Sequence, residues 1–380
     1  MSRRKQLSIA MVCISTLLTI ACSHPDSDAG KTSPAATRND DKVLNFYTWS
    51  DYIAPDTIPS FEKLTGIKVN VSYFDTNEML EARMLTGRSG FDVVVSAGPY
   101  FQRQIRSGAY VPLDKKQLPN LANLDPALMS QAALNDPGNI YGVIYTWGTY
   151  GIGYNEKTVA SALPGVSINS WRLVFDPTFA AKLASCGISF VDTPAGVTRL
   201  VLKYLGKDPN APGAPDLVDV ETVLTKIRPY IRNIESANYI QALANGELCI
   251  AVGVNGDIVQ ARKRAEEART GIKVRFLIPD EGSLIWFDML AIPKDAPHAA
   301  NAYLFVNYLM NPQVIANISN VIGYANGNAA ATPLLEKATA DDPAIYPPPD
   351  LQRHLNVHLV DSPEQSRAIT RIWQKFKTGQ

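Results

Sequence analysis

The stretch VLNFYTWSDYIAPDTIPSFEKLTGIKVNVSY (43–73) decides the fold class. Residues 43–48 are rich in β-branched and aromatic side chains and predict a strand. Apolar residues at helical spacing over 58–64, followed by a Thr-Gly stop at Gly66, predict a helix. Apolar and polar residues then alternate over 67–73, which predicts a second strand. A strand, a helix and a strand in this order predict a right-handed βαβ unit with parallel strands.

The same alternation continues along the chain. A helix is predicted up to Thr86, a buried strand over 92–95, and a second series of strands and helices after Asn155. We therefore expect an α/β protein with a mostly parallel sheet and two lobes around a hinged cleft, where small molecules usually bind. The expected first lobe comprises 43–150 and 283–322, and the second comprises 151–282 and 323–380.

Composition excludes several classes of protein. The 380 residues include 36 Lys plus Arg and 36 Asp plus Glu, so the basic excess of a nucleic-acid binder is missing. Hydrophobic residues make up 46% of the chain, which is ordinary for a globular protein. No apolar run reaches the roughly 18–20 residues of a membrane span.

The N-terminus has the pattern of a secretory signal over residues 1–22. Arg3, Arg4 and Lys5 precede an apolar stretch that is too short to span a membrane. The stretch ends in Ala21-Cys22, which is similar to a bacterial lipobox, although Thr19 stands where a leucine is usual. We expect Cys22 to be lipidated and residues 23–42 to form a flexible tether. The alternative is plain cleavage and a freely soluble periplasmic protein.

Two cysteines remain in the mature fold, Cys186 and Cys249, because Cys13 lies inside the signal. An exported protein matures in an oxidising compartment, so we expect these two to form a disulfide. The alternative is a pair of buried thiols.

Signatures of enzymes are weak. The chain has no Walker loop, no G-x-S-x-G and no H-E-x-x-H. His354 and His358 have the spacing of two metal ligands on one helix face, but no third ligand is near. We therefore expect no catalytic residues, no metal and no cofactor, and keep a metal-assisted hydrolase as the minor alternative.

Acidic residues stand beside aromatic residues at four places near predicted strand ends: Trp49-Ser50-Asp51-Tyr52, Asn255-Gly256-Asp257, Trp286-Phe287-Asp288 and Tyr324. A carboxylate accepts strong hydrogen bonds from an organic ammonium group. An aromatic face adds a cation–π attraction of about 0.5–2 kcal/mol. The alternative interpretation is a set of core aromatics and helix-capping acids. Convergence of the four motifs would instead make a site for an organic cation.

With these motifs, the chain resembles bacterial periplasmic polyamine-binding proteins, most closely the putrescine-binding ones. The resemblance runs from about Val43 to the C-terminus and rests on several stretches together. It implies the two-lobed class II fold of solute-binding proteins, a monomer in the periplasm, and delivery of the ligand to an ABC permease in the inner membrane. The stretches are Phe46-Tyr47-Thr48-Trp49-Ser50-Asp51-Tyr52-Ile53, Phe61-Glu62-Lys63-Leu64-Thr65-Gly66-Ile67, Gly151-Ile152-Gly153-Tyr154-Asn155, Tyr204-Leu205-Gly206-Lys207-Asp208-Pro209-Asn210, Gly256-Asp257, Phe287-Asp288 and Ile345-Tyr346-Pro347-Pro348.

The resemblance also implies which residues bind the ligand. Asp257 and Asp288 match acids that hold the two terminal amines, and Trp286 stands where the family has a phenylalanine. The implied ligand-binding residues are Trp49, Ser50, Asp51, Tyr52, Ser236, Asp257, Trp286, Asp288 and Tyr324.

Other positions depart from the family pattern. Ala97 replaces a serine, Ala195-Gly196 lacks an acid, and Val254 replaces a tryptophan. These changes leave the fold and the transport role intact but leave the cargo open, so that another amine or cationic metabolite is the first alternative. A receptor that senses polyamines through a membrane partner is a further alternative, because sensing shares every sequence feature of transport.

Overall fold

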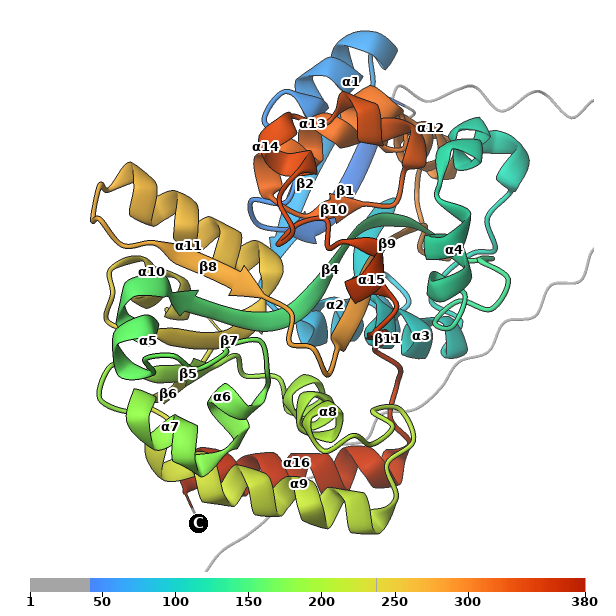
Figure 1. Ribbon diagram of the computed structural model, residues 1–380. Helices are drawn as coiled ribbons and strands as arrows, with labels where there is room; N and C mark the ends of the chain where they lie inside the picture. Colours follow the sequence, from blue (N-terminus) through green and yellow to red (C-terminus); the bar gives the residue numbers. More distant parts are fainter. Residues whose placement is uncertain (1–41, 237, 380) are drawn as a thin grey trace, which may run out of the picture. The chain divides into compact units, whose positions relative to one another are not determined.

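A mixed sheet of eleven strands organises the part of the chain that the computed structural model describes, residues 42–236 and 238–379 (Figure 1). All of these residues belong to one unit, Asn39–Gln380. The expected signal, Cys22 and the tether up to residue 41 lie outside the described residues. The strands are β1 (Val43–Trp49), β2 (Lys68–Phe74), β3 (Val93–Ala97), β4 (Gly142–Asn155), β5 (Ile188–Phe190), β6 (Asn233–Ile234), β7 (Ile250–Val254), β8 (Val274–Leu277), β9 (Ser283–Ala291), β10 (Ala325–Asn326) and β11 (Leu355–Val357).

Helices connect and cover these strands. They are α1 (Thr57–Thr65), α2 (Asn77–Leu85), α3 (Gly98–Arg106), α4 (Pro126–Ala132), α5 (Glu156–Ala162), α6 (Arg172–Phe175), α7 (Pro177–Leu183), α8 (Pro194–Tyr204), α9 (Ala214–Ile227), α10 (Tyr239–Ala244), α11 (Asn255–Glu267), α12 (Ala299–Leu309), α13 (Pro312–Ile322), α14 (Lys337–Ala340), α15 (Pro349–Gln352) and α16 (Pro363–Thr378).

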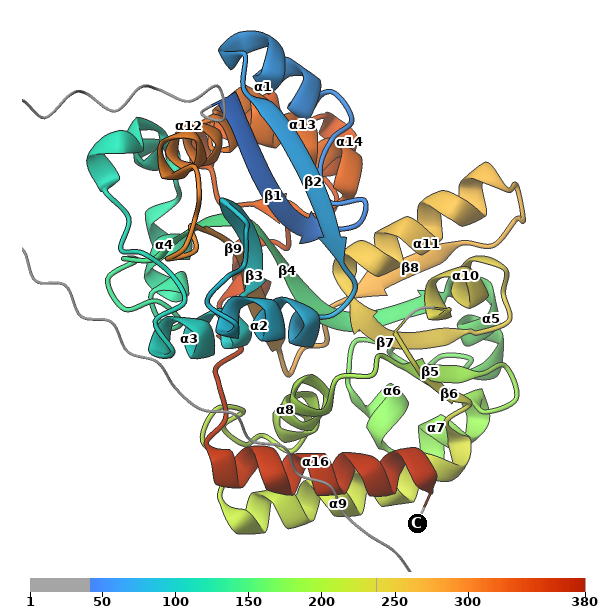
Figure 2. The same cartoon turned by 180° about the vertical axis from the view of Figure 1, so that it is seen from behind.

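The predicted βαβ unit at the start of the fold is confirmed. β1 pairs in parallel with β2 along its whole length, and α1 connects the two strands. Gly66 ends α1 with a φ of 70°, a left-handed conformation that glycine adopts without steric cost. β1 also pairs in parallel with β3, and Figure 2 shows α2 and α3 beside these strands.

The 14-residue strand β4 takes part in two groups of strands. Its residues 142–149 pair with β9, and its residues 150–155 pair with β7 and β8. We call β1, β2, β3, β9, β10, β11 and the first half of β4 the first strand group. The second half of β4 with β5, β6, β7 and β8 is the second strand group. The chain therefore builds two halves on one continuous strand.

The expectation of a mostly parallel sheet is wrong. Of ten strand pairings in the described residues, five are parallel and five are antiparallel. All five antiparallel pairings involve β4 or β9, because these strands run back through the sheet between the parallel units.

Two short strands extend the first group from late in the sequence. β10 pairs with β4 at Trp147 and Thr146, and β11 pairs in parallel with β9. Both strands fall within 323–380, which the sequence assigned to the second lobe. The lobe boundaries themselves stay a prediction.

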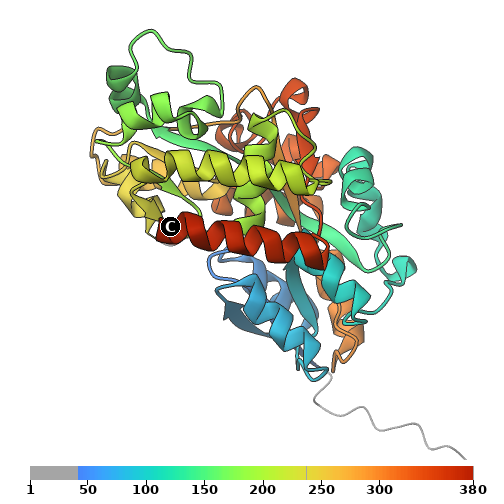
Figure 3. The same ribbon diagram turned by 90° about the horizontal axis from the view of Figure 1, so that it is seen from below.

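Each strand group has its own core. Phe46, Val95 and Phe305 belong to a buried cluster of the first group. A second cluster contains Phe190 of β5, Leu200 of α8 and Trp373 of α16. In Figures 1 and 3, α16 lies along α9, and both helices contribute to this second cluster. The C-terminal helix therefore belongs with the second strand group.

The two mature-fold cysteines lie together in the second half. Cys249 directly precedes β7, and Cys186 lies just before β5, the neighbour of β7. Their Cα atoms are 5.4 Å apart and their sulfur atoms 2.00 Å apart.

We predict that the exported protein carries this bond, because its compartment is oxidising and the two strands hold the cysteines side by side. Thiol labelling of denatured, unreduced mature protein should find neither Cys186 nor Cys249 free. Reduction should lower the free energy of unfolding by about 4 kcal/mol, the value expected for opening the loop that the Cys186–Cys249 bond closes. Ready labelling of both thiols without reductant would refute the bridge.

Candidate functional site

The turn after β1 carries the first group of predicted site residues. Trp49 ends β1, and its ring centroid lies 4.4 Å from that of Phe74. Ser50 and Asp51 lie exposed in the turn, and Asp51 has a positive φ of 55°. Aspartate tolerates this left-handed conformation better than most residues. The chain then returns into the protein at Tyr52, which is 6% exposed.

Asp288 is the buried acid of the first strand group. It lies within β9, opposite Ala97 of β3 and Thr146 of β4. The Tyr52 hydroxyl donates to its Oδ2 at 2.8 Å and lies 2.7 Å from Thr146 Oγ1. Burial leaves Asp288 4% exposed and raises the pKa of its carboxyl to about 7, while the Tyr52 hydrogen bond opposes the shift.

Asp257 is the acid of the second strand group and lies in the first turn of α11. It accepts hydrogen bonds from the hydroxyls of Tyr239 and Tyr324, the latter at 3.2 Å. Part of its surface is exposed, yet surrounding protein atoms desolvate the carboxyl and raise its pKa, against the opposing effect of the two hydroxyls. The helix N-terminus also favours its negative charge.

Tyr324 brings the two acids into one cluster. Its ring centroid lies 5.5 Å from that of Tyr52 and 5.4 Å from that of Trp286. A continuous path of contacts therefore runs from Asp288 through Tyr52 and Tyr324 to Asp257. We call Tyr52, Asp257, Trp286, Asp288 and Tyr324 the acid–aromatic cluster.

Two glycines permit this close packing. A Cβ atom at Gly256 would lie 2.0 Å from Cζ of Tyr324, and one at Gly148 would lie 2.4 Å from Cζ2 of Trp286. Any larger residue at either position would displace an aromatic wall of the cluster.

Four predicted residues are not brought into the cluster. Ser50, Asp51 and Ser236 are exposed, and no hydrogen bond or ring contact given for the described residues joins them to it. Ser236 instead accepts a hydrogen bond at 3.2 Å from the backbone N–H of Asp192. Trp49 packs on Phe74, and its buried indole N–H has no acceptor among the described residues.

The sequence placed Trp286-Phe287-Asp288 near the end of a strand, but the structure places these residues within β9. β9 begins at Ser283, so Asp288 lies inside the strand with neighbours on both sides. This position explains its deep burial.

Three contributing residues were missed from the sequence. Tyr239 is fully buried beneath Asp257, and Thr146 contacts Tyr52. An irregularity in the β4–β9 pairing between Ile144 and Thr146 sets Thr146 opposite Asp288. Tyr145, which lies between Ile144 and Thr146 in β4, donates its hydroxyl to the Tyr52 carbonyl at 2.8 Å. A register shift leaves no mark in hydrophobic periodicity, so no sequence signal pointed to Thr146 or Tyr145.

The departures from the family pattern also have structural positions. Gly196 lies in the first turn of α8, where a Cβ atom would meet Thr193 at 2.7 Å and Tyr150 at 3.3 Å. Neighbouring side chains thus occupy the space that a side chain at 196 would need. Val254 lies opposite Tyr150 across the β4–β7 pairing.

The histidine pair does not share a helix face. His354 lies in a turn before β11 and His358 follows that strand. Burial lowers the pKa of His358 well below its usual range, and the charges of Arg199 and Arg103 lower it further. The helical arrangement that the sequence suggested for these two residues is therefore wrong.

Neither acid of the cluster forms an ion pair within residues 42–236 and 238–379. Two desolvated carboxyls lined by tyrosine and tryptophan rings suit a cation, whose charge would stabilise their ionised forms.

Comparison with known proteins agrees with this geometry. Residues 57–347 match the family described as bacterial extracellular solute-binding protein. The chain belongs to this family. Its members are transport proteins and not enzymes, so the expectation of a non-enzymatic protein is confirmed.

Named relatives cover nearly the whole chain. The putrescine-binding periplasmic protein SpuD of Pseudomonas aeruginosa is 46% identical over 352 residues, which are 92% of this chain and 96% of that protein. The putrescine-binding periplasmic protein PotF of Escherichia coli is 47% identical over 340 residues, which are 89% of this chain and 92% of that protein. The resemblance inferred from the sequence is confirmed.

A solved structure supports the fold. The spermidine/putrescine substrate-binding protein PotD of Streptococcus pneumoniae superposes with a TM-score of 0.78 at 26% identity, covering 89% of this chain and 99% of that one. The predicted two-lobed α/β solute-binding fold is confirmed. Within residues 42–236 and 238–379, no helix is long and apolar enough to cross a membrane.

The raised pKa of Asp288 predicts a pH-dependent stability. The unfolded group titrates near 3.8 and the folded one near 7, so the penalty for burying the charge is full above pH 7, shrinks as the pH falls from 7 towards 3.8, and is absent below that. We expect Asp288→Asn, which keeps an acceptor for Tyr52, to raise the free energy of unfolding of ligand-free protein at about pH 8 by up to about 4 kcal/mol. At about pH 4.5 the gain should be small.

Denaturant titrations at both pH values measure this difference. Asp341→Asn, at an exposed position, is the control and should change neither value. An Asp288→Asn effect of equal size at both pH values would show that the buried charge is not its cause.

Proposed function

We propose that this protein captures a polyamine, putrescine or a related amine, in the acid–aromatic cluster outside the cytoplasm and delivers it to an inner-membrane ABC permease. The observation that carries the proposal is the pair of desolvated acids, Asp257 and Asp288, which lack a cationic partner among the described residues and are linked through Tyr324 and Tyr52. The names of the 46% and 47% identical relatives support a diamine as the cargo.

Each acid would hold one ammonium group. Asp257 accepts from two phenols, and its two oxygens keep further lone pairs for an ammonium group. Asp288 accepts from Tyr52 through Oδ2, so its Oδ1 can accept from an ammonium group. Tyr324 and Trp286 would flank the methylene chain between the two ends.

Capture would proceed by closure of two lobes around the ligand. Asp257 follows β7 of the second strand group, and Asp288 lies on β9 of the first. A dication that touches both acids binds the closed arrangement more tightly and shifts the population towards it. Asp51, exposed in the turn after β1, would add a third carboxylate on closure.

Three finer statements belong to the proposal. The exported protein would act as a monomer in the periplasm, tethered to the membrane through a lipidated Cys22. Ser50 and Ser236 would contact the ligand. The alternatives are a different cationic metabolite as cargo, and a role in sensing polyamines through a membrane partner.

Native mass spectrometry of the purified protein tests the proposal directly. A co-purified amine would appear as a mass difference that disappears after denaturation. Calorimetric titration with putrescine, agmatine and spermidine should then give saturable binding with one site, and no binding of any amine would overturn the proposal.

The two acids predict the strongest losses of affinity. Asp257→Asn and Asp288→Asn should each weaken binding of the preferred amine by about 3–5 kcal/mol, because one partner of a buried ion pair is lost. Calorimetry measures the change. Asp341→Asn serves again as the matched control and should bind as wild type does. Affinities within twofold of wild type for both acid variants would show that the cluster is not the site.

The departures from the family pattern predict a broader ligand range. Ala97 removes a hydroxyl and Gly196 a carboxylate, and each lost charged hydrogen bond weakens a short diamine by about 1.5–3 kcal/mol. Val254 removes a large aromatic wall beside Asp257. We therefore expect weaker putrescine binding than in a relative with the full set of residues, and relatively better binding of agmatine or spermidine.

Titrations followed by tryptophan fluorescence measure this preference, because Trp286 belongs to the cluster. Putrescine, cadaverine, agmatine and spermidine should be compared in one buffer. A sub-micromolar preference for putrescine that excludes the longer amines would show that the three substitutions were misinterpreted.

A further inference from the structure

The segment 355–361 connects the two halves of the protein a third time, in addition to β4 and the link 278–282 between β8 and β9. It begins as β11, which pairs with β9 of the first strand group. Ser362 follows it, and the side chains of Ser362 and Gln365 cap the start of α16 reciprocally. Because α16 packs in the core of the second group, residues 355–361 pass from the first half to the second. We call this segment the C-terminal crossover. Its conformation must change whenever the relative position of the two halves changes.

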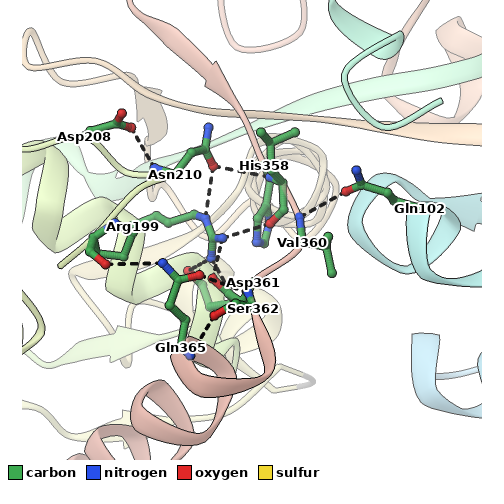
Figure 4. A network of polar contacts seen from close by, with 12 residues as sticks. Gln102, Arg199, Asp208, Asn210, His358, Val360, Asp361, Ser362 and Gln365 are labelled. Atoms are coloured by element: carbon green, nitrogen blue, oxygen red, sulfur yellow. Dashed lines mark hydrogen bonds and ion pairs between the residues drawn. The ribbon is translucent and has the colours of Figure 1, made fainter. Parts of the chain in front are cut away.

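Arg199 of α8 holds the crossover from the second group (Figure 4). The residue is 1% exposed, and its Nη2 donates to Asp361 Oδ1 at 2.7 Å and to the Leu359 carbonyl at 2.8 Å. Its Nη1 donates to Asp361 Oδ2 at 3.3 Å, so the pair is bidentate. The rigid fork of a guanidinium suits this combination, which a lysine cannot reproduce.

Two further side chains bind the crossover from the same side. Asn210 donates to the Val357 carbonyl at 2.9 Å, and Lys203 donates to Asn356 Oδ1 at 2.9 Å. Asn210 also accepts from Arg199 Nε at 3.4 Å. The second group therefore grips the crossover along most of its length.

The first group holds the start of the crossover through the β11–β9 pairing, and His358 N–H donates to the Ile285 carbonyl at 3.0 Å. Beyond this pairing, Gln102 of α3 accepts from Val360 N–H at 3.3 Å, and Asn135 donates to the His358 carbonyl at 3.2 Å. Figure 4 shows Gln102 approaching Val360 from the side opposite Arg199. These two neutral side-chain hydrogen bonds are weaker than the charged pair of Arg199.

Arg199 is also connected to the proposed ligand site. Its Nη1 donates to the Ala195 carbonyl in the first turn of α8 at 3.1 Å. The adjacent Gly196 lies against Tyr150, which pairs with Val254 just before the α11 turn of Asp257. One side chain thus links the crossover to the part of the second group that borders the site.

We infer that Arg199 is a positioning residue for ligand capture: its ion pair with Asp361 fixes the C-terminal crossover to the second half and so restricts how far the two halves separate when no ligand is bound. The inference rests on the proposed function for its link to affinity. The crossover is then held at both ends, by the β11–β9 pairing on the first half and by Arg199 on the second, and movement between the halves changes the weaker Gln102 and Asn135 contacts. Without the bidentate pair between Arg199 and Asp361, the crossover would no longer be fixed to the second half. The ligand-free protein would then sample a wider range of open arrangements, and closure around a ligand would cost more conformational entropy.

Small-angle X-ray scattering of the ligand-free mature protein tests the restriction without any ligand. The variants are Arg199→Lys, which keeps the charge but loses the fork, and Asp361→Asn, which keeps the shape but loses the charge. Both should increase the radius of gyration and broaden the distribution of interatomic distances. Calorimetry with the preferred amine should show Kd raised about tenfold, within the range usual for coupled sites.

Glu62→Gln is the control. Glu62 of α1 forms an ion pair with Lys68 at 3.0 Å and accepts from the Val69 N–H of β2 at 2.9 Å, within the first half. It should lower thermal stability without changing the scattering. If Arg199→Lys or Asp361→Asn fails to fold by circular dichroism, the double variant Arg199→Met, Asp361→Leu removes both charges together and replaces it.

Ligand-free scattering identical to wild type in the folded variants would overturn the inference, even if their melting temperatures fall, because the pair would then be structural alone. Absence of amine binding by the wild type would overturn the proposed function and leave the scattering comparison valid. A broadened distribution of interatomic distances together with an unchanged Kd for the preferred amine would overturn the link between Arg199 and ligand capture.

Discussion

The burial of two carboxyl groups without a cation beside them is the constraint on which the rest of the structure depends. Asp288 lies inside a central strand, and Asp257 lies at a helix N-terminus, so each is held by an element that cannot easily move it into water. Phenolic hydroxyls supply the hydrogen bonds that make this burial tolerable. A site of this kind stores unfavourable electrostatic free energy that a bound cation relieves, and closure can be driven by that relief.

Much of the fold could be predicted from local patterns. The βαβ unit at 43–73 followed from period, turn residues and strand composition, because those signals depend on neighbours in sequence. The acids and aromatic residues of the cluster could be identified because organic cations require that chemistry, and the family resemblance indicated which of them to combine. Their convergence, in contrast, needed the structure: Tyr324 is separated from Asp257 by 67 positions and from Tyr52 by far more.

The missed features share a cause: they arise from pairing between distant segments. The antiparallel course of β4 and β9, the irregular register that sets Thr146 opposite Asp288, and the late strands β10 and β11 are all set by long-range pairing. The exposed positions of Ser50, Asp51 and Ser236 have a similar origin, since a motif gives residue type and not orientation. Tyr239 was missed because a buried tyrosine looks like any core residue until its hydroxyl is seen beside a carboxylate.

The pKa of Asp288 has a consequence for the thermodynamic balance of capture. Because burial raises the pKa of this carboxyl to about 7, part of the ligand-free population is protonated near neutral pH. A bound cation favours the ionised form of the Asp288 carboxyl. Ligand binding therefore releases, on average, a fraction of a proton from the protein. The enthalpy of association then contains the ionisation enthalpy of the buffer, and the receptor's net charge rises by less than the charge of its cargo. In a compartment that equilibrates with the medium outside the cell, acidification would favour the proton over the ligand.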